Sequence, residues 1–357
     1  MFRVAINGYG RIGRIAHRVI LERFSEHIDL VAINAGSSTD IKGWMNLLKY
    51  DTAYGPILSL NINYQDPEPM PLIKDLVGYL IIEDKKIPVT SQKDPMLLPW
   101  QDLEVDVVIE STGHFTTLEK LQKHLNAGAK SVILSAPSKG EGVPTYVLGV
   151  NAQDYQGEKI INNASCTTNC IAPVAKIMVD NFGVEKAMMT TIHSYTSDQK
   201  LHDGGHSDYR RSRAAAYNIV PTSTGAAIAT GEVVGELKEV FEGLAVRVPV
   251  IVGSLSDFTF VLKKETTVDE VNNILKQASE DPNYEGILMT SEEPIVSSDI
   301  IGNPYSSIVD LSLTQVIGNL VKIVAWYDNE YGYANRLIEE VLMVGNYLNQ
   351  KLPQSNS

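Results

Sequence analysis

Cys166 is the residue whose local sequence best suits covalent chemistry. It lies in the run NASCTTNC (163–170), where small polar residues lead into a stretch of helical character. Backbone N–H groups and the dipole at a helix N-terminus lower the pKa of a thiol, which favours a nucleophilic thiolate. A buried cysteine without a chemical role is the alternative interpretation of Cys166 taken alone.

His193 is the candidate partner of this thiol. It ends the strand-like run MMTTIH (188–193) and could meet Cys166 in space as its activating base. A lone histidine in such a place is more often structural, so the pair is persuasive only when more of the chain agrees. The only other cysteine, Cys170, has no Cys or His cluster nearby, so neither a disulfide framework nor a metal site is expected.

A glycine pattern near the start predicts a nucleotide site. Gly8, Gly10 and Gly13 form a GxGxxG between the strand-like RVAING and a helical stretch, inside a βαβ unit over residues 3–34. Such glycines permit a tight turn and close backbone approach, and the helix N-terminus receives a pyrophosphate. An ordinary glycine turn is the alternative.

The end of the second strand bears on the choice between NAD and NADP. An Asp or Glu is expected there to bind the adenosine ribose, but the sequence has Ala35, within Asn34-Ala35-Gly36-Ser37-Ser38. A carboxylate would repel a 2′-phosphate, whereas serine hydroxyls can donate hydrogen bonds to it. The alternative is that Gly36 and the serines only form a turn.

These residues must be positioned by two different architectures. Up to about residue 160, strand-like and helical runs alternate, which predicts a doubly wound parallel sheet of the Rossmann type. The later runs alternate β-branched and polar residues, which predicts an α+β domain with a mostly antiparallel sheet. We expect a dinucleotide-binding domain over 1–165, completed by a C-terminal helix over 330–357, and a catalytic domain over 166–329.

The individual elements are predicted from the same runs. The predicted strands are 28–34, 79–83, 105–112 and 131–137. The predicted helices are 116–129, 168–182 and 267–280, and a Pro-rich loop or hairpin is expected at 55–78.

Composition narrows the function class. A chain of 357 residues with 44% hydrophobic residues has material for two cores. A net charge of −13 disfavours nucleic-acid and anionic-membrane partners. No run approaches the ~20 apolar residues of a membrane span, so we expect a cytoplasmic protein.

Longer motifs carry a family resemblance. NGYGRIGR, NASCTTNC, IHSYTSDQ, RRSRAAAYNIVPTSTGAA, LAVRVPV and AWYDNEYGY follow one another along the chain. Over essentially its whole length the sequence resembles the glyceraldehyde-3-phosphate dehydrogenases. The resemblance implies Cys166 as nucleophile, His193 as base, and phosphorylating oxidation of an aldehyde phosphate with NAD or NADP. A related erythrose-4-phosphate dehydrogenase and a catalytically silent binding protein of the same fold are the alternatives.

The resemblance also implies binding residues and an assembly. It implies a homotetramer acting on glyceraldehyde 3-phosphate and inorganic phosphate. The substrate and phosphate sites would use Ser165, Thr167, Thr196, Thr224, Gly225 and Arg247. The cofactor would contact Gly8, Gly10, Arg11, Ile12, Gly13, Asn34, Ala35, Ser37, Thr112, Ser135, Asn329 and Tyr333.

One loop departs from the strictly NAD-dependent pattern. The run LHDGGHSDYRR has Gly204-Gly205 where those relatives carry a bulkier Leu-Pro pair. Together with Ala35, the two glycines leave room for a 2′-phosphate, so we expect dual NAD/NADP use or a preference for NADP.

Overall fold

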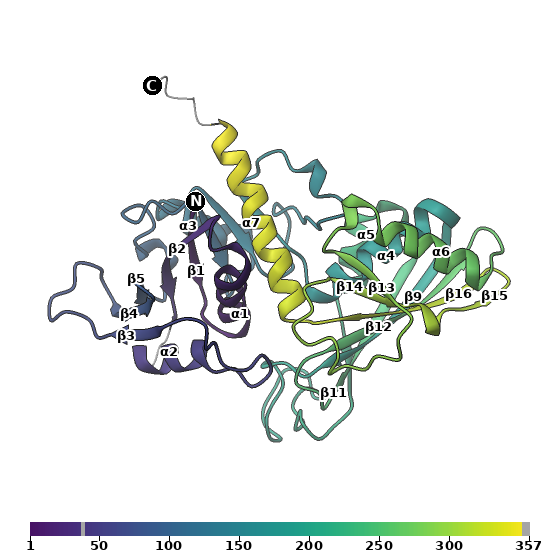
Figure 1. Cartoon of the computed structure of the whole chain (residues 1–357), viewed down its shortest axis with the longest axis horizontal. Helices are drawn as coiled ribbons and strands as arrows, with labels where there is room; N and C mark the ends of the chain where they lie inside the picture. The colour runs from purple at the N-terminus through teal and green to yellow at the C-terminus, as the bar shows by residue number, and fades with distance from the viewer. Residues whose placement is uncertain (37–39, 352–357) are drawn as a thin grey trace. The chain divides into compact units, whose positions relative to one another are not determined.

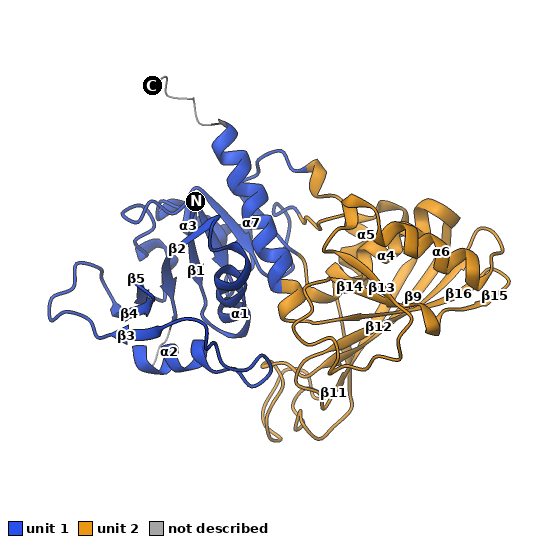
Figure 2. Ribbon diagram, in the orientation of Figure 1, with its two compact units in different colours: residues 1–144, 155–163, 334–357 blue, residues 145–154, 164–333 orange. Residues whose placement is uncertain are grey.

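The structure is a computed structural model that describes residues 1–36 and 40–351 (Figure 1). The chain forms two compact units (Figure 2). Unit 1 comprises residues 1–144, 155–163 and 334–357, and unit 2 comprises residues 145–154 and 164–333. The predicted combination of a parallel sheet and a mostly antiparallel sheet is confirmed.

Unit 1 is built on an eight-stranded sheet with the order β3-β4-β5-β2-β1-β6-β7-β8. Its six strands from β5 to β8 are parallel, while β3 and β4 form an antiparallel hairpin at one edge. This hairpin includes much of the Pro-rich segment. The strands are β1 (Phe2–Asn7), β2 (Ile28–Asn34), β3 (Ile62–Gln65), β4 (Leu76–Ile82), β5 (Lys85–Thr90), β6 (Val107–Glu110), β7 (Ser131–Leu134) and β8 (Ile160–Asn162).

Helices connect the parallel strands of unit 1. Helix α1 (Arg11–Val19) follows β1, α2 (Ile41–Lys49) follows β2, and α3 (Leu118–Asn126) follows β6. Strands β1, β6 and β7 are almost wholly buried and apolar, as expected for parallel strands covered on both faces. The C-terminal helix α7 (Tyr331–Lys351) belongs to unit 1 from residue 334 onward.

Unit 2 is built on a second sheet with the order β10-β11-β9-β12-β16-β14-β13, with β15 paired to β16. Most pairs of neighbouring strands in this sheet are antiparallel, but β9 pairs with β11, and β13 with β14, in the parallel direction. The strands are β9 (Val184–Ser194), β10 (Val220–Ser223), β11 (Phe241–Val248), β12 (Ser254–Leu262), β13 (Leu288–Ser291), β14 (Ser307–Asp310), β15 (Gln315–Ile317) and β16 (Leu320–Tyr327).

Three helices supply the other layer of unit 2. They are α4 (Cys166–Phe182), α5 (Ala226–Val233) and α6 (Val268–Ser279). Helix α4 packs on β9, β12, β14 and β16 and also contacts α5 and α6. Its buried Ile171, Val174 and Met178 share one core with Phe258 and Phe260 of β12. Helix α4 is therefore held firmly along its length. In the part of the chain that the structure describes, no helix is long and apolar enough to cross a membrane.

Candidate active site

Helix α4 begins at the cysteine singled out above. Ser165 caps the helix, because its Oγ accepts a hydrogen bond from the backbone N–H of Thr168 at 3.1 Å. The preceding Ala164 is fully buried and has a φ of 49°, a left-handed conformation that costs a non-glycine residue about 1–2 kcal/mol. This strained turn directs the chain from β8 into the helix and leaves Cys166 at its first position.

Cys166 and His193 meet in the structure. The Sγ atom of Cys166 lies 3.5 Å from Nε2 of His193, the residue before the end of β9. Nδ1 of His193 lies 2.7 Å from the carbonyl oxygen of Ser194, which can only accept, so Nδ1 carries the proton. Nε2 therefore presents a lone pair to the thiol. This is the arrangement that a general base requires.

Burial sets the resting charges of this pair. It raises the pKa of the Cys166 thiol, an effect that the nearby Arg247 and Thr167 oppose without reversing. Burial and the Arg247 charge lower the pKa of His193 to about 3. The sequence favours a lowered thiol pKa at this helix N-terminus; in the structure, desolvation is the larger effect on Cys166 and acts in the opposite direction.

A buried chain of hydroxyls underlies the pair and was not predicted from the sequence. Tyr327 lies 3.0 Å from Thr167 Oγ1 and 2.8 Å from Thr191 Oγ1 through its hydroxyl. Thr191 donates to the carbonyl oxygen of Leu255, so Tyr327 donates to Thr191 and Thr167 donates to Tyr327. The Tyr327 ring also packs edge-on against His193. Elements α4, β9 and β16 are thus joined directly beneath the two reactive atoms.

Arg247 and Thr196, predicted to bind one phosphate, lie together. Arg247 stands opposite His193 in the register of β11 with β9, and its Nη1 donates to Thr196 Oγ1 at 2.9 Å. Nε of Arg247 is buried without a partner among the described residues. A guanidinium with donors to spare is suited to an oxyanion.

Asp198 is a charged neighbour of this group that sequence reasoning missed. It accepts a hydrogen bond from Thr196 and forms an ion pair with Arg211 at 2.7 Å. Burial acts to raise the pKa of Asp198, but the Thr196 hydrogen bond and the charges of Arg247 and Arg211 hold it below its usual value. Asp198 is therefore a carboxylate that anchors the rim of the candidate phosphate site.

The second predicted anion group lies at two helix starts. Ser165 caps α4, while Gly225 precedes α5 and Thr224 Oγ1 accepts from the N–H of Ala226 at 3.2 Å. Helices α4 and α5 pack against each other. Helix N-termini attract anions, so the placement suits a phosphate. Thr167 is largely occupied by its hydrogen bond to Tyr327.

The glycine pattern of unit 1 forms a cradle. Gly8 has a φ of 99°, and a Cβ at this residue would lie 2.5 Å from the backbone nitrogen of Thr112. A Cβ at Gly13 would lie 2.1 Å from the carbonyl oxygen of Gly8, whereas Gly10, which precedes α1, meets nothing within 4 Å. This turn has no side chains over the start of α1, so the pyrophosphate of a dinucleotide could approach the backbone there.

The other predicted cofactor residues of unit 1 follow strand ends. Arg11 and Ile12 begin α1, and Arg11 forms an ion pair of 2.5 Å with Asp51. Ala35, Thr112 and Ser135 come just after β2, β6 and β7. The carboxyl ends of neighbouring parallel strands are where such folds bind nucleotides. Ser37 lies outside the described residues.

Asn329 and Tyr333 lie in unit 2. Asn329 Oδ1 accepts hydrogen bonds from the N–H of Gly253 and the hydroxyls of Ser194 and Ser254, at 3.0–3.1 Å. Because its oxygen is occupied, Asn329 can offer a ligand only the N–H donors of its amide. Tyr333 donates to the carbonyl oxygen of Ala164 at 3.3 Å and so supports the strained turn before Cys166.

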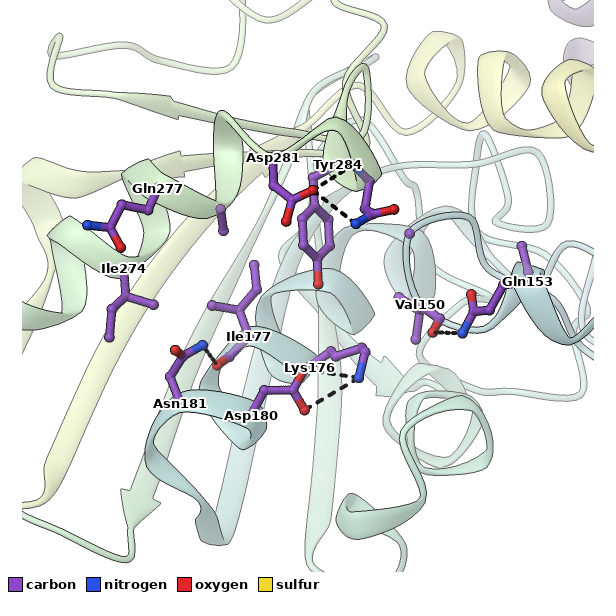
Figure 3. Close-up of a pocket in the computed structure, with 14 residues that line it drawn as sticks. Val150, Gln153, Lys176, Ile177, Asp180, Asn181, Ile274, Gln277, Asp281 and Tyr284 are labelled. Atoms are coloured by element: carbon purple, nitrogen blue, oxygen red, sulfur yellow. Dashed lines mark hydrogen bonds and ion pairs between the residues drawn. The ribbon is translucent and has the colours of Figure 1, made fainter.

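A separate pocket of about 620 Å³ lies farther along α4 (Figure 3). Lys176 and Asp180 line the pocket and form an ion pair, and Tyr284 and Ile274 are among its other lining residues. Lys176 is ten residues after Cys166, about 15 Å along a helix. This pocket holds none of the predicted reactive residues. Among the described residues, no cluster of His, Cys, Asp and Glu could hold a metal ion.

Comparison with known proteins identifies the family. Residues 2–118 match the glyceraldehyde 3-phosphate dehydrogenase NAD-binding domain, and residues 165–329 match the C-terminal domain of the same enzymes. The chain belongs to the glyceraldehyde-3-phosphate dehydrogenase family. It is an oxidoreductase of that type with a nicotinamide cofactor.

Relatives match almost end to end. The chain is 49% identical to the glyceraldehyde-3-phosphate dehydrogenase of Mycolicibacterium smegmatis, over 97% of this chain and 99% of the relative. It is 49% identical to glyceraldehyde-3-phosphate dehydrogenase 2 of Trichormus variabilis, over 95% and 97% of the two chains. Identity to the Streptomyces coelicolor enzyme is 47%, over 97% and 99%. The resemblance seen in the sequence is thereby confirmed.

Proposed function

We propose that the chain catalyses the reversible, phosphorylating oxidation of D-glyceraldehyde 3-phosphate to 1,3-bisphosphoglycerate. The observation that carries this proposal is the placement of a thiol, a neutral imidazole and a phosphate-type cation together. Cys166 Sγ is 3.5 Å from His193 Nε2, and Arg247 donates to Thr196, two residues after the end of β9. A nucleophile, a base and an anion anchor are the groups that an aldehyde phosphate needs.

The first step forms a covalent bond to the substrate. The Cys166 sulfur attacks the aldehyde carbon, and the thiol proton passes to His193 Nε2. The imidazolium then returns this proton to the carbonyl oxygen, which gives a thiohemiacetal. The 3.5 Å contact between Cys166 Sγ and His193 Nε2 couples the attack to the proton transfer.

Oxidation follows on the same carbon. His193 accepts the hydroxyl proton of the thiohemiacetal while the carbon loses a hydride, which the nicotinamide cofactor accepts when bound. A thioester on Cys166 remains. Asn329, whose amide oxygen is occupied, would donate through its amide N–H groups to an acceptor on the nicotinamide.

Phosphate completes the reaction. An oxygen of inorganic phosphate attacks the thioester carbon, the C–S bond breaks, and Cys166 regains its proton from His193. Ser165, Thr224 and Gly225 would hold the attacking phosphate at the starts of α4 and α5, with Thr196 and Arg247 holding the phosphate of the substrate. Thr167 would act mainly through its link to Tyr327.

We also propose that NADP is accepted as well as NAD. Ala35 N–H donates to the Thr90 carbonyl oxygen at 2.8 Å, and its methyl side chain places no carboxylate at the end of β2. A Cβ at Gly205 would meet nothing within 4 Å in the described chain. Both features leave space for a 2′-phosphate.

We further propose that the chain assembles as a homotetramer. The family is generally oligomeric, and unit 2 exposes large apolar side chains that a partner copy would cover. They include Met188, Leu201, Tyr209, Tyr217, Ile219 and Leu244, with exposed fractions of 45–87%. The cytoplasmic location stays a prediction from the sequence.

The reaction is tested by initial rates with glyceraldehyde 3-phosphate, with and without inorganic phosphate, using NAD and NADP on one preparation. We expect phosphate-dependent reduction with both cofactors and none from Cys166→Ser. Turnover with NAD alone would contradict the proposed cofactor range. Erythrose 4-phosphate as a better substrate would contradict the proposed reaction.

A further inference from the structure

A line of hydrogen bonds crosses the carboxyl ends of four parallel strands in unit 1. Thr90 of β5 donates to Asn34 Oδ1 at 3.0 Å, and Asn34 Nδ2 donates to Asn7 Oδ1 at 2.6 Å. Asn7 Nδ2 in turn donates to Glu110 Oε2 at 2.5 Å. All four residues are buried. Each is the last residue of its strand, so the line follows the edge of the sheet where the glycine cradle lies.

Glu110 is the acceptor on which this line ends. Besides Asn7, it accepts from His124 Nε2 at 3.0 Å and from the backbone N–H and the hydroxyl of Thr112 at 2.8 and 2.5 Å. Four hydrogen bonds on two oxygens use the full acceptor capacity of this side chain. No Lys or Arg pairs with Glu110 in residues 1–36 and 40–351, so its polar contacts are hydrogen bonds alone.

The histidine beside Glu110 is neutral by geometry. Trp100 Nε1 lies 3.0 Å from His124 Nδ1. The indole nitrogen can only donate, so Nδ1 of His124 carries no proton and its Nε2–H points at the carboxylate. His124 thus supplies a hydrogen bond and no compensating charge.

Burying Glu110 is costly for a residue that would only fill space. A carboxyl group without a Lys or Arg partner is costly to bury, and an apolar side chain of similar size would fill the site at lower cost. Unlike an apolar side chain, Glu110 accepts hydrogen bonds from both the backbone N–H and the hydroxyl of Thr112. The Thr112 nitrogen it fixes is the atom that a Cβ at Gly8 would approach to 2.5 Å. Glu110 therefore fixes one wall of the glycine turn.

We propose that Glu110 is a positioning residue for the dinucleotide, acting through Thr112 and Asn7 to hold the glycine turn in its binding shape. This inference rests on the proposed use of a nicotinamide dinucleotide. Glu110 itself contacts no cofactor atom in this account. Its role is to keep the turn organised before the ligand arrives, which lowers the cost of binding.

Glu110→Gln tests the proposal because it preserves size and removes acceptors. An NH₂ group on one side would face the N–H of Thr112, and on the other side the N–H of His124, whose tautomer Trp100 fixes. We expect the dissociation constants of NAD and NADP, measured by tryptophan fluorescence titration, to rise at least tenfold. The kcat at saturating cofactor, the KM for the aldehyde and the alkylation rate of Cys166 should stay within about twofold.

Val132→Ala is the matched control for lost stability. Val132 is fully buried on β7, beside β6, and has no part in the hydrogen-bond line. It should lower the melting temperature without weakening cofactor binding. Equal cofactor affinity in Glu110→Gln and the wild type would overturn the proposal, as would an equal loss in Val132→Ala.

Asn7 gives a second route if Glu110→Gln does not fold, because it donates to Glu110 and is not among the predicted cofactor contacts. Asn7→Ala removes this donor. We expect weaker cofactor binding for Asn7→Ala than for Val132→Ala; equal cofactor affinity of Asn7→Ala and the wild type would overturn the proposal. If the wild type itself bound neither NAD nor NADP, the proposed cofactor use would be at fault instead.

Discussion

Arg247 Nη1 lies 3.1 Å from His193 Nδ1, and both groups share the carbonyl oxygen of Ser194 as an acceptor. Two donors so close to one another disfavour a further positive charge on the imidazole. The guanidinium that we assign to the substrate phosphate therefore also helps to keep the base unprotonated. Substrate binding and base strength are coupled through one side chain.

Replacing Arg247 should change both properties. In Arg247→Leu, loss of the nearby cation raises the pKa of His193, since that cation lowers it in the wild type. The base is then protonated at higher pH, so the acidic limb of the kcat/KM profile moves upward. The KM for glyceraldehyde 3-phosphate should rise as well, by about tenfold or more for a lost charge-assisted contact. A changed KM with an unmoved acidic limb would contradict the coupling.

His193→Asn should remove the base while leaving the thiol in place. Loss of general base catalysis typically costs a factor of about 10²–10⁴ in rate. We expect kcat to fall within that range and alkylation of Cys166 near neutral pH to slow markedly. Cofactor affinity should hardly change, because the glycine turn that we assign to the dinucleotide belongs to unit 1 and His193 to unit 2. Near wild-type kcat would show that another group takes the proton.

Tyr327→Phe should disturb the pair without touching substrate. Thr167 loses its acceptor and Thr191 loses its donor, so the first turn of α4 and the end of β9 are no longer tied together. We expect kcat to fall by roughly tenfold, because small misplacements of reacting groups are costly. Tyr284→Phe is the matched control, since Tyr284 lines the separate pocket and takes no part in the hydroxyl chain beneath Cys166 and His193. Equal effects of the two substitutions would contradict a specific role for Tyr327.

The fully buried His17 of helix α1 should make the stability of the chain depend on pH. Burial lowers its pKa to about 3, below its ordinary value of 6.5. Between these values the unfolded chain binds a proton that the folded chain does not, so the free energy of unfolding falls as pH falls through this window. One such group gives a slope of up to about 1.4 kcal/mol per pH unit. Denaturant unfolding of His17→Gln between pH 4 and 6.5 should show a shallower slope; an unchanged slope would contradict this origin.

Local rules explain why part of this site was predictable. Gly8 and Gly13 have no room for a Cβ, so the cradle requires glycine at those spacings and the sequence shows it. Ser165 caps α4 through its own side chain, so the start of the helix near Cys166 was also visible, although the predicted helix began two residues late. The β3–β4 hairpin followed from its turn-rich composition.

The rest depends on contacts between distant segments. Tyr327 reaches Thr167 and Thr191 only because β16, β12 and β9 are neighbours in one sheet, across 160 and 136 residues of sequence. Glu110 meets Asn7 through the pairing of β6 with β1. The effect of burial on the pKa of Cys166 was not visible in the sequence for the same reason, because desolvation is a property of tertiary packing and not of the local motif.

The most direct test of the central claim is a rapid-mixing experiment with substrate and NAD in the absence of phosphate. The account predicts a burst of one equivalent of NADH per Cys166, an acyl mass increment on the peptide that contains Cys166, and continuous turnover once phosphate is added. Steady turnover without phosphate, or a burst that persists in Cys166→Ser, would contradict a thioester on this cysteine.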